Sequence, residues 1–574
     1  MKPEIKNKET FFLLITFLFL MLDFNSYKQD IKKQIKPVFF KSGHSQRAME
    51  RNTWYLERLK APGINKIPIG IRKKELAFAA KLKAQFSLRG SESSVFEYRG
   101  PYNVGGRTRA LGIDVSNDSI YIAGGTSGAI YRSVNAGKSW LKESDPDQVL
   151  SVSCIAQDTR QGKQNVWYFG TGEAFGASAS GGGAYYLGNG LYRSADSGKT
   201  WASLSSTATN TPHDFDGLWD LCWNIAVDKS NDSLDVIYAA ILGSIMRSDD
   251  GGQNWTMGLG GSTSAFSYCT DVVITDSGIV YASLSSDGPV SQNGLWRSAD
   301  GLNWLNIKDS LWPAIYDRVV MSINPHNQKE VYFLAVTPGA GKECIAWDGD
   351  SEWVSLWKYE DINNGIWTDL SANIPTGPYR FDDFCPQGGY NLHIACSPYD
   401  SNTLFIGGTN LYRSTDGFRS DSNTSFIGGY KEDTDLPFFD LYPNQHPDQH
   451  RLVFHKNNPN IMIAATDGGL FKCNDSQSSN IAWESLNKGY LTTQFYTIAI
   501  NENNNSEKIL GGLQDNGTHY IAENDPTGDW VMSFTYDGAY CAIPDHENYV
   551  YMSAQSGKII KASLDTAGQI SSWA

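Results

Sequence analysis

The stretch Leu191-Tyr-Arg-Ser-Ala-Asp-Ser-Gly-Lys-Thr-Trp201 decides the fold, because variants of the same phrase recur along the chain. Each variant has an apolar strand ending in Ser, followed by Asp or Asn, then Gly, and in most copies Trp. Such an Asp or Asn can accept hydrogen bonds from the backbone N–H groups of its own turn, Gly supplies positive φ, and Trp covers the hairpin. We therefore predict a structural role for Asn135, Trp140, Asp196, Trp201, Asp250, Trp255, Asp300, Trp304 and Asp416.

Degenerate units extend this repeat to the end of the chain and are recognised by their terminal Trp: Trp367, Trp483, Trp530 and Trp573. The units follow one another at about 45 to 65 residues, the period of a four-stranded β-propeller blade. Seven units end by Trp483. The sequence thus predicts an all-β chain with a seven-bladed propeller over residues 96–490 and the first blades of an incomplete second propeller over 491–574. A single larger ring is the alternative.

Composition agrees with many short strands. The 574 residues include 55 Gly, 13% aromatic and only 19% charged residues, which suits strands and tight turns better than long charged helices. A chain of this length exceeds the roughly 250 to 300 residues that one hydrophobic core supports, so a repeat architecture is favoured. Because the chain stops just after Trp573, we expect a fragment of a longer reading frame.

The N-terminus has the pattern of an export signal. Lys2, Lys6 and Lys8 precede an apolar run over residues 11–22 that is interrupted only by Thr16, which matches the charged and hydrophobic regions of a signal peptide over residues 1–22. No small-x-small cleavage site precedes Asp23, so an uncleaved anchor stays open as the one route to a membrane. Either form predicts a protein that is secreted or held at the cell surface or in the periplasm.

Charge is divided unevenly along the chain. A basic N-terminal segment spans residues 23–95, and residues 23–90 of it carry a net charge of +11. Residues 91–574 carry a net charge of −26, and the chain as a whole has a net charge of −14. A strongly acidic body excludes nucleic acid as its partner. We expect the basic segment to dock on that body rather than on lipid or nucleic acid.

No metal or cofactor is expected. Eight Cys are scattered singly, without the paired spacing of a zinc site or the density of a disulfide scaffold. Cys385 and Cys396 are close enough in sequence to bridge in an oxidising compartment. The stretch His446-Pro-Asp-Gln-His450 offers two imidazoles and a carboxylate, but its spacing matches no established zinc signature.

Blade topology predicts which loops share a face. Inner strands are expected over residues 108–114, 222–228, 319–324, 393–397 and 451–455, so the loops before them emerge opposite the repeated Asp residues, together with the loops that join the second and third strands. These loops carry Arg107, Glu173, Trp219, Asp220, Asp317, Arg318, Tyr390, His446, Asp448, His450, Asp467 and Asp515. This mixture of acidic, basic and aromatic groups is typical of a site for a polar ligand or glycan.

The repeated phrase resembles the Asp-box of sialidases, sortilin-type propellers and xyloglucan-active enzymes built from two propellers. Residues 170–173 (Gly-Thr-Gly-Glu), 467–469 (Asp-Gly-Gly) and 514–518 (Gln-Asp-Asn-Gly-Thr) look like a family of secreted bacterial sortilin-like repeat proteins. The resemblance implies an exported propeller that binds an extracellular glycan, protein or peptide at the face opposite the Asp-boxes. Fold alone does not assign a chemistry.

Glycoside hydrolysis by paired carboxylates is the alternative, with Asp467, Asp448, Glu173 and Asp515 as candidates. Xyloglucan-active enzymes carry a catalytic Asp in a Thr-Asp-Ile-Gly-Gly-x-Tyr-Arg phrase, where this chain has Thr126. The Phe/Tyr-Arg-Ile-Pro phrase of sialidases is also absent, since residues 98–101 read Tyr-Arg-Gly-Pro. We therefore expect binding rather than hydrolysis.

Overall fold

The structure is a computed structural model that describes residues 56–88 and 98–573 apart from short gaps. The predicted signal segment and residues 23–55 and 89–97 lie outside the described residues, as does the Gly-rich stretch over 175–185. The remaining gaps are 146–147, 149–150, 209–216, 262–266, 289–291, 347–348, 435–438, 502–507, 523–526, 546–548 and 567.

The described residues form nine antiparallel sheets, which are meanders of four strands except for the fifth. The first three sheets are β1 (Thr108–Ile113), β2 (Tyr121–Gly125), β3 (Ala129–Ser133), β4 (Leu141–Lys142); β5 (Val152–Gln157), β6 (Trp167–Thr171), β7 (Leu191–Ser194), β8 (Ala202–Ser203); and β9 (Cys222–Val227), β10 (Ile237–Ile241), β11 (Ser244–Ser248), β12 (Thr256–Gly260). The next two are β13 (Thr270–Ile274), β14 (Val280–Leu284), β15 (Gly294–Ser298), β16 (Trp304–Asn306); and β17 (Val319–Ile323), β18 (Glu330–Val336), β19 (Lys342–Ile345), β20 (Ser351–Glu360), β21 (Ile366–Asp369). The last four are β22 (His393–Cys396), β23 (Leu404–Gly407), β24 (Leu411–Ser414), β25 (Thr424–Gly428); β26 (Gln449–Phe454), β27 (Met462–Thr466), β28 (Gly469–Cys473), β29 (Trp483–Ser485); β30 (Phe495–Ile500), β31 (Ile509–Leu513), β32 (Thr518–Ile521), β33 (Val531–Phe534); and β34 (Cys541–Ala542), β35 (Val550–Ala554), β36 (Lys558–Leu564), β37 (Ile570–Trp573).

Seven of the sheets close into a ring. The innermost strands β1, β5, β9, β13, β17, β22 and β26 each pack against the next, and β26 packs back on β1. A buried cluster joins the first and seventh blades through Leu111, Tyr121, Ile463 and Leu470, among others. The all-β prediction of four-stranded blades, with a seven-bladed ring followed by the start of a second, is confirmed. The exception is the fifth blade, in which β19 is an extra strand that pairs with the first residues of β20.

Tryptophans at the blade edges bond in two ways. In three copies of the repeated turn the indole N–H donates within its own turn, as in Trp201 to the Gly198 carbonyl at 3.1 Å. In the first, fifth and seventh blades the indole instead donates to the preceding blade around the ring: Trp140 to Leu486 at 2.8 Å, Trp367 to Ile307 at 2.8 Å and Trp483 to Ile427 at 2.7 Å. These bonds fasten neighbouring blades together.

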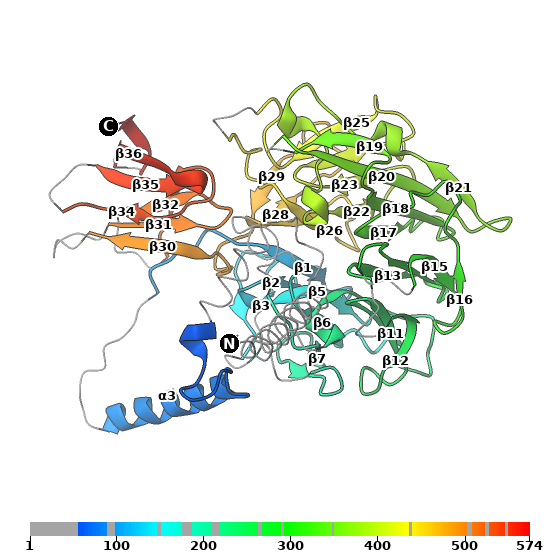
Figure 1. Ribbon diagram of the computed structural model, residues 1–574, viewed down its shortest axis with the longest axis horizontal. Coiled ribbons are helices and arrows are strands. Elements are labelled where there is room, and N and C mark those ends of the chain that lie inside the picture. Colours follow the sequence, from blue (N-terminus) through cyan, green and yellow to red (C-terminus); the bar gives the residue numbers. More distant parts are fainter. Residues whose placement is uncertain are drawn as a thin grey trace, which may run out of the picture.

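The eighth and ninth sheets form a separate body beside the ring, seen in orange and red in Figure 1. Leu510, Met552 and Ala562 belong to its own buried cluster. Asn103, just before the first blade, exchanges two 3.0 Å hydrogen bonds with the backbone of Trp530, which fixes this body to the ring. Its position brings the β31–β32 turn against the face of the ring that carries the candidate loops.

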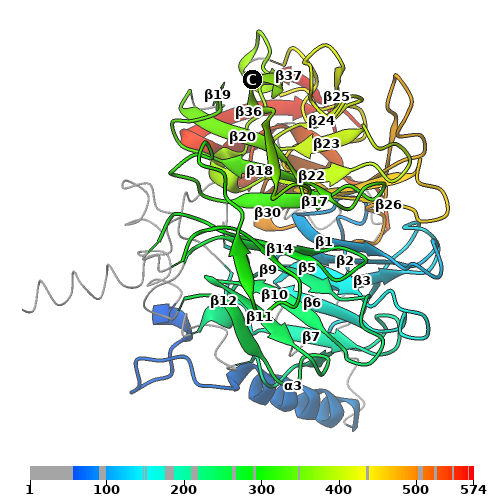
Figure 2. The ribbon, with the colours of Figure 1, turned by 90° about the vertical axis from the view of Figure 1, so that its right-hand side faces the viewer.

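Helix α3 (Ile71–Leu88) lies outside both bodies in Figures 1 and 2. Single-turn 3₁₀ helices lie in the loops as η2 (Leu218–Asp220), η3 (Ser371–Asn373), η4 (Arg380–Asp382), η5 (Gln387–Gly389) and η6 (Gln555–Gly557). Docking of the basic segment stays a prediction. Within the described residues, no helix is long and apolar enough to cross a membrane.

Closeness in sequence left a bridge between Cys385 and Cys396 open, and the structure does not form it. Cys385 and Cys396 are both free thiols, and they lie in different surroundings. The Cys396 thiol contacts the Ser322 carbonyl at 3.8 Å, whereas the Cys385 thiol lies 3.6 Å from a carboxylate oxygen of Glu352. Proximity in sequence failed as a guide because Cys396 ends inner strand β22 while Cys385 lies in the loop before it.

Candidate functional site

A fully buried carboxylate lies at the centre of the candidate site. Asp467 occupies the two-residue turn between β27 and β28, whose Thr466 and Gly469 pair across the hairpin. Its carboxylate accepts hydrogen bonds from Arg107 Nε at 3.2 Å, from His450 Nε2 at 2.6 Å and from the Tyr390 hydroxyl. The side chains of Asp467 and Arg107 are 0% exposed, so this group is built into the protein and is closed to solvent.

Arg107 links the ring to the second body. It lies just before β1, where the β1–β2 register is irregular, and its Nη2 donates to Asp515 Oδ2 at 3.1 Å. Its guanidinium also lies 4.7 Å from the ring centroid of Tyr390. Burial alone would lower the pKa of Arg107, but Tyr390, Asp467 and Asp515 together raise that pKa well above its ordinary value. Arg107 therefore stays charged between two carboxylates.

Asp448 has a contrasting environment. It is partly exposed, adopts a left-handed backbone with φ of 64°, and accepts a hydrogen bond from Asn391 Nδ2 at 2.5 Å. Burial, reinforced by the negative charges of Asp467 and Asp515, raises its pKa well above the usual value for an aspartate. Asp448 therefore keeps its proton at a pH where an ordinary carboxylate is ionised.

Asp515 and Asp537 form the part of the site contributed by the second body. Asp515 lies in the β31–β32 turn, its side chain is 10% exposed, and its backbone N–H donates to Asp537 Oδ1 at 2.7 Å. Burial, followed by the charge of Asp515, raises the pKa of Asp537 to about 8. The site thus holds a carboxylate paired with arginine beside carboxyl groups that retain protons.

Glu173 and two arginines support the loop that carries Tyr390. Glu173 is 1% exposed and pairs with Arg109 Nε. Arg109 and Arg318 donate to the Tyr390 carbonyl at 3.1 and 3.2 Å, and Arg318 also donates to the Gly389 carbonyl at 2.7 Å. Burial and the nearby charge of Arg109 lower the pKa of Arg318 to about 10. Glu173 is therefore a buried ion-pair partner.

Below this layer the inner strands enclose a cavity of about 440 Å³ along the ring axis. Its polar lining includes Arg109, Arg318 and Arg451 together with Glu173 and Asp271. Asn224 and the backbone N–H of Met321 donate to Asp271 at 2.8 and 3.0 Å. The lining carries more positive than negative groups, in contrast to the acidic net charge of the chain.

The remaining sequence candidates have structural surroundings. Trp219 packs against Trp255 with ring centroids 5.0 Å apart. Asp220 ends η2, and its carboxylate accepts the N–H of the N-cap residue Gly217 at 2.9 Å. Asp317 lies apart from the Asp467 group. Burial raises its pKa to about 6, and burial together with the charge of Asp317 raises the pKa of Asp287 to about 7.

The two histidines of residues 446–450 do not converge. His446 nitrogens lie 3.0 Å from the carbonyls of Pro447 and Asp515, whereas His450 bonds Asp467. Burial lowers the pKa of both imidazoles. Among the described residues these groups form no metal-ligand cluster with Asp448; the one such cluster comprises Cys344, Glu352 and Cys385.

The turn between β2 and β3, where the resemblance leads one to expect a carboxylate, holds Thr126. Thr126 is fully buried and its backbone N–H donates to the Arg107 carbonyl at 3.1 Å. Asp467 occupies the corresponding turn of the seventh blade. Sequence reasoning missed Asn391 and Asp537, although both lie in loops that lead into an inner strand and the same topological rule would have included them.

Comparison with known proteins agrees with this architecture, although no protein-family model matches the sequence. A xyloglucanase from a Paenibacillus species is 25% identical over 364 residues, covering 53% of this chain and 32% of the relative. A xyloglucanase from Acetivibrio thermocellus is 22% identical over 350 residues, covering 52% of this chain and 39% of the relative. The chain therefore spans well under half the length of these curated relatives.

Solved structures give the same result at the level of fold. An ancestral GH74 enzyme matches with a TM-score of 0.54 and 15% identity, over 83% of this chain and 62% of that one. The GH74 xyloglucanase from Xanthomonas campestris matches with a TM-score of 0.52 and 14% identity, over 83% and 74%. The chain is thus a β-propeller protein. More particularly, it shares the fold of the propellers in GH74 enzymes.

Proposed function

We propose that this protein is an exported glycoside hydrolase that cleaves an extracellular polysaccharide of the xyloglucan type. The observation that carries the proposal is the contrast between Asp448 and Asp515, which lie on opposite bodies at one junction. Hydrolysis of a glycosidic bond needs one protonated and one ionised carboxyl group. The similarity to two xyloglucanases supports this chemistry over the binding-only hypothesis.

Asp448 is the general acid in this proposal. Its raised pKa favours the protonated form that a general acid needs, and the hydrogen bond from Asn391 fixes its orientation. Asp448 is a partly exposed residue, whereas Asp467 is 0% exposed and its carboxylate accepts three hydrogen bonds.

Asp515 is the ionised partner. Its ion pair with Arg107 at 3.1 Å favours the charged form, and its 10% exposure leaves an edge of the carboxylate accessible. Arg107, which pairs with Asp515, is itself held by Asp467 and by the ring of Tyr390. His450 in turn bonds Asp467. Glu173, buried and paired with Arg109, has no direct part in the reaction.

The test is release of reducing ends from xyloglucan, cellulose and sialylated glycans by the purified protein and by Asp448→Asn and Asp515→Asn variants. We expect turnover on xyloglucan and a loss of roughly a hundredfold or more in each variant. The matched control is Asp250→Asn, which changes an Asp-box on the opposite face. A second control is Asp317→Asn, which alters the separate carboxylate pair.

Xyloglucan binding by each variant, measured by affinity electrophoresis, separates chemistry from recognition. The proposal expects both Asn variants to bind with unchanged affinity. Retained binding by a wild-type protein that releases no product from any substrate would contradict it and favour a recognition propeller. Loss of turnover in Asp317→Asn alone would instead indicate that Asp317 and Asp287 carry the reaction.

A further inference from the structure

A cluster of two thiols and a carboxylate lies on the fifth blade, apart from the candidate site. Cys344 and Glu352 are cross-strand partners in the β19–β20 hairpin. Cys385 comes from the loop between η4 and η5. One ligand atom from each of these residues lies within 4.8 Å of the other two, and the Cys385 thiol lies 3.6 Å from Glu352 Oε2.

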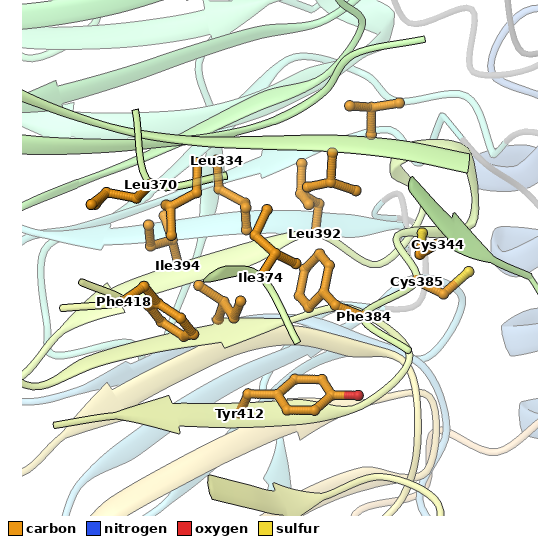
Figure 3. Packing of buried hydrophobic residues seen from close by; sticks show 14 of the residues in the cluster. Leu334, Cys344, Leu370, Ile374, Phe384, Cys385, Leu392, Ile394, Tyr412 and Phe418 are labelled. Carbon is orange, nitrogen blue, oxygen red and sulfur yellow. The ribbon is translucent and has the colours of Figure 1, made fainter. Parts of the chain in front are cut away.

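The cluster of Cys344, Cys385 and Glu352 is buried on the side of its thiols and partly exposed to solvent on the side of Glu352. Cys344 and Cys385 are 1% and 5% exposed and belong to the hydrophobic cluster that the fifth and sixth blades share. Figure 3 shows their sulfur atoms at one edge of this cluster, far from Phe418. Glu352 is only partly buried and faces η5, whose Gly388 has open space where a Cβ would lie. An ion from solvent could therefore reach the thiols past Glu352.

We infer that Cys344, Cys385 and Glu352 bind a thiophilic divalent cation, Zn²⁺, with water completing a tetrahedral shell. Zinc bonds of about 2.0 to 2.3 Å place tetrahedral ligand atoms roughly 3.3 to 3.8 Å apart, which the separation between the Cys385 thiol and Glu352 already meets. Two sulfur ligands favour zinc over the oxygen-preferring Ca²⁺ and Mg²⁺. Binding displaces the two thiol protons to solvent and transfers no electrons.

The cation would link the β19–β20 hairpin to the loop before β22. Two bonds already hold these segments together: the Gly388 N–H donates to Glu352 Oε2 at 3.1 Å, and the Ile345 N–H donates to Asp383 Oδ2 at 2.9 Å. The same loop continues to Tyr390 and Asn391, which contact Asp467 and Asp448. This role would give a structural purpose to β19, the extra strand that distinguishes the fifth sheet among the described residues. It does not depend on whether the protein cleaves a glycan.

The experiment measures bound zinc in the full chain, purified without chelator and dialysed, followed by titration of the zinc-free protein. We expect one Zn²⁺ per chain and, after replacement by Cd²⁺, the ultraviolet absorption of cadmium thiolate. Cys344→Ser and Cys385→Ser should lose both signals, and Glu352→Gln should weaken zinc binding roughly tenfold or more. Cys396→Ser is the matched control and should bind zinc as the wild type does.

Two results would overturn the inference. One is wild-type protein that takes up no stoichiometric zinc although both thiols are reduced. The other is a Cys344–Cys385 disulfide in the protein as purified, seen by peptide mapping under non-reducing conditions. Because Glu352→Gln leaves both cysteines in place, its weakened binding also separates a metal site from a fold defect caused by the Ser variants.

Discussion

At the scale of single residues, environment separates aspartates that the sequence cannot distinguish. Asp467 and Asp448 lie in neighbouring loops of the seventh blade, and both were candidates. Asp467 is enclosed by Arg107, Tyr390 and His450, whereas Asp448 has a single donor, Asn391, and a raised pKa. Burial and partners, which depend on distant parts of the chain, enclose Asp467 and raise the pKa of Asp448, the property that the proposed general acid needs.

Removal of the Tyr390 hydroxyl tests whether the Asp467 cluster stabilises the fold. Tyr390→Phe removes a hydrogen bond to a buried charged carboxylate, which typically contributes about 1.5 to 3 kcal/mol. We expect the free energy of unfolding, measured by urea denaturation, to fall by about that amount. The exposed Tyr379 provides the control, since Tyr379→Phe should leave stability unchanged. Equal stability of wild type and Tyr390→Phe would contradict a closed Asp467 cluster.

Asp537 gives a pH-dependent signature. Its folded-state pKa of about 8 lies above the ordinary 3.8, so its protonated form stabilises the fold fully below the ordinary value. That contribution is lost as the pH rises towards 8. Asp537→Asn should therefore lose less stability than wild type between pH 4 and pH 8, measured by thermal melting across that range. The exposed Asp440, changed to Asn, should follow the wild-type curve; an unchanged curve for Asp537→Asn would contradict the buried carboxyl pair.

At the scale of elements, local patterns predicted the blades and topology predicted the face. Four of the five expected inner strands begin at the expected residue, and β26 begins two residues earlier than expected. The loops of Arg107, Asp448 and Asp467 lie together, as strand order leads one to expect. The contacts of Trp219 and Asp220 are instead structural. The β19–β20 hairpin and the contacts of Asp537 could not be predicted, since an insertion leaves the repeat intact and the second body reaches the site through tertiary packing.

Ring closure depends on contacts between the first and seventh blades. Trp140→Phe would keep an aromatic ring there but remove the 2.8 Å bond to the Leu486 carbonyl, leaving a buried acceptor unpaired at a cost of about 1 to 3 kcal/mol. We expect a lower melting temperature by calorimetry. Trp304→Phe is the matched control, because its 3.2 Å bond stays within one partly exposed turn, and it should cost less. A greater loss in Trp304→Phe would contradict closure through Trp140.

At the scale of the whole molecule, the candidate site exists only because two bodies meet. The ring supplies Arg107, Asp448 and Asp467, and the second body supplies Asp515. Solved GH74 enzymes share this fold over most of the chain, although sequence identity is only 14 to 15%. The junction, rather than any single motif, is therefore the feature that the proposed hydrolysis requires.

The most direct test is the initial rate of xyloglucan hydrolysis by the wild type and by Asp448→Asn under identical conditions, with substrate binding measured alongside. The account predicts measurable hydrolysis by the wild type and a rate lower by roughly a hundredfold or more in the variant, at unchanged affinity. Equal rates in the two proteins, or binding without any hydrolysis by the wild type, would contradict it.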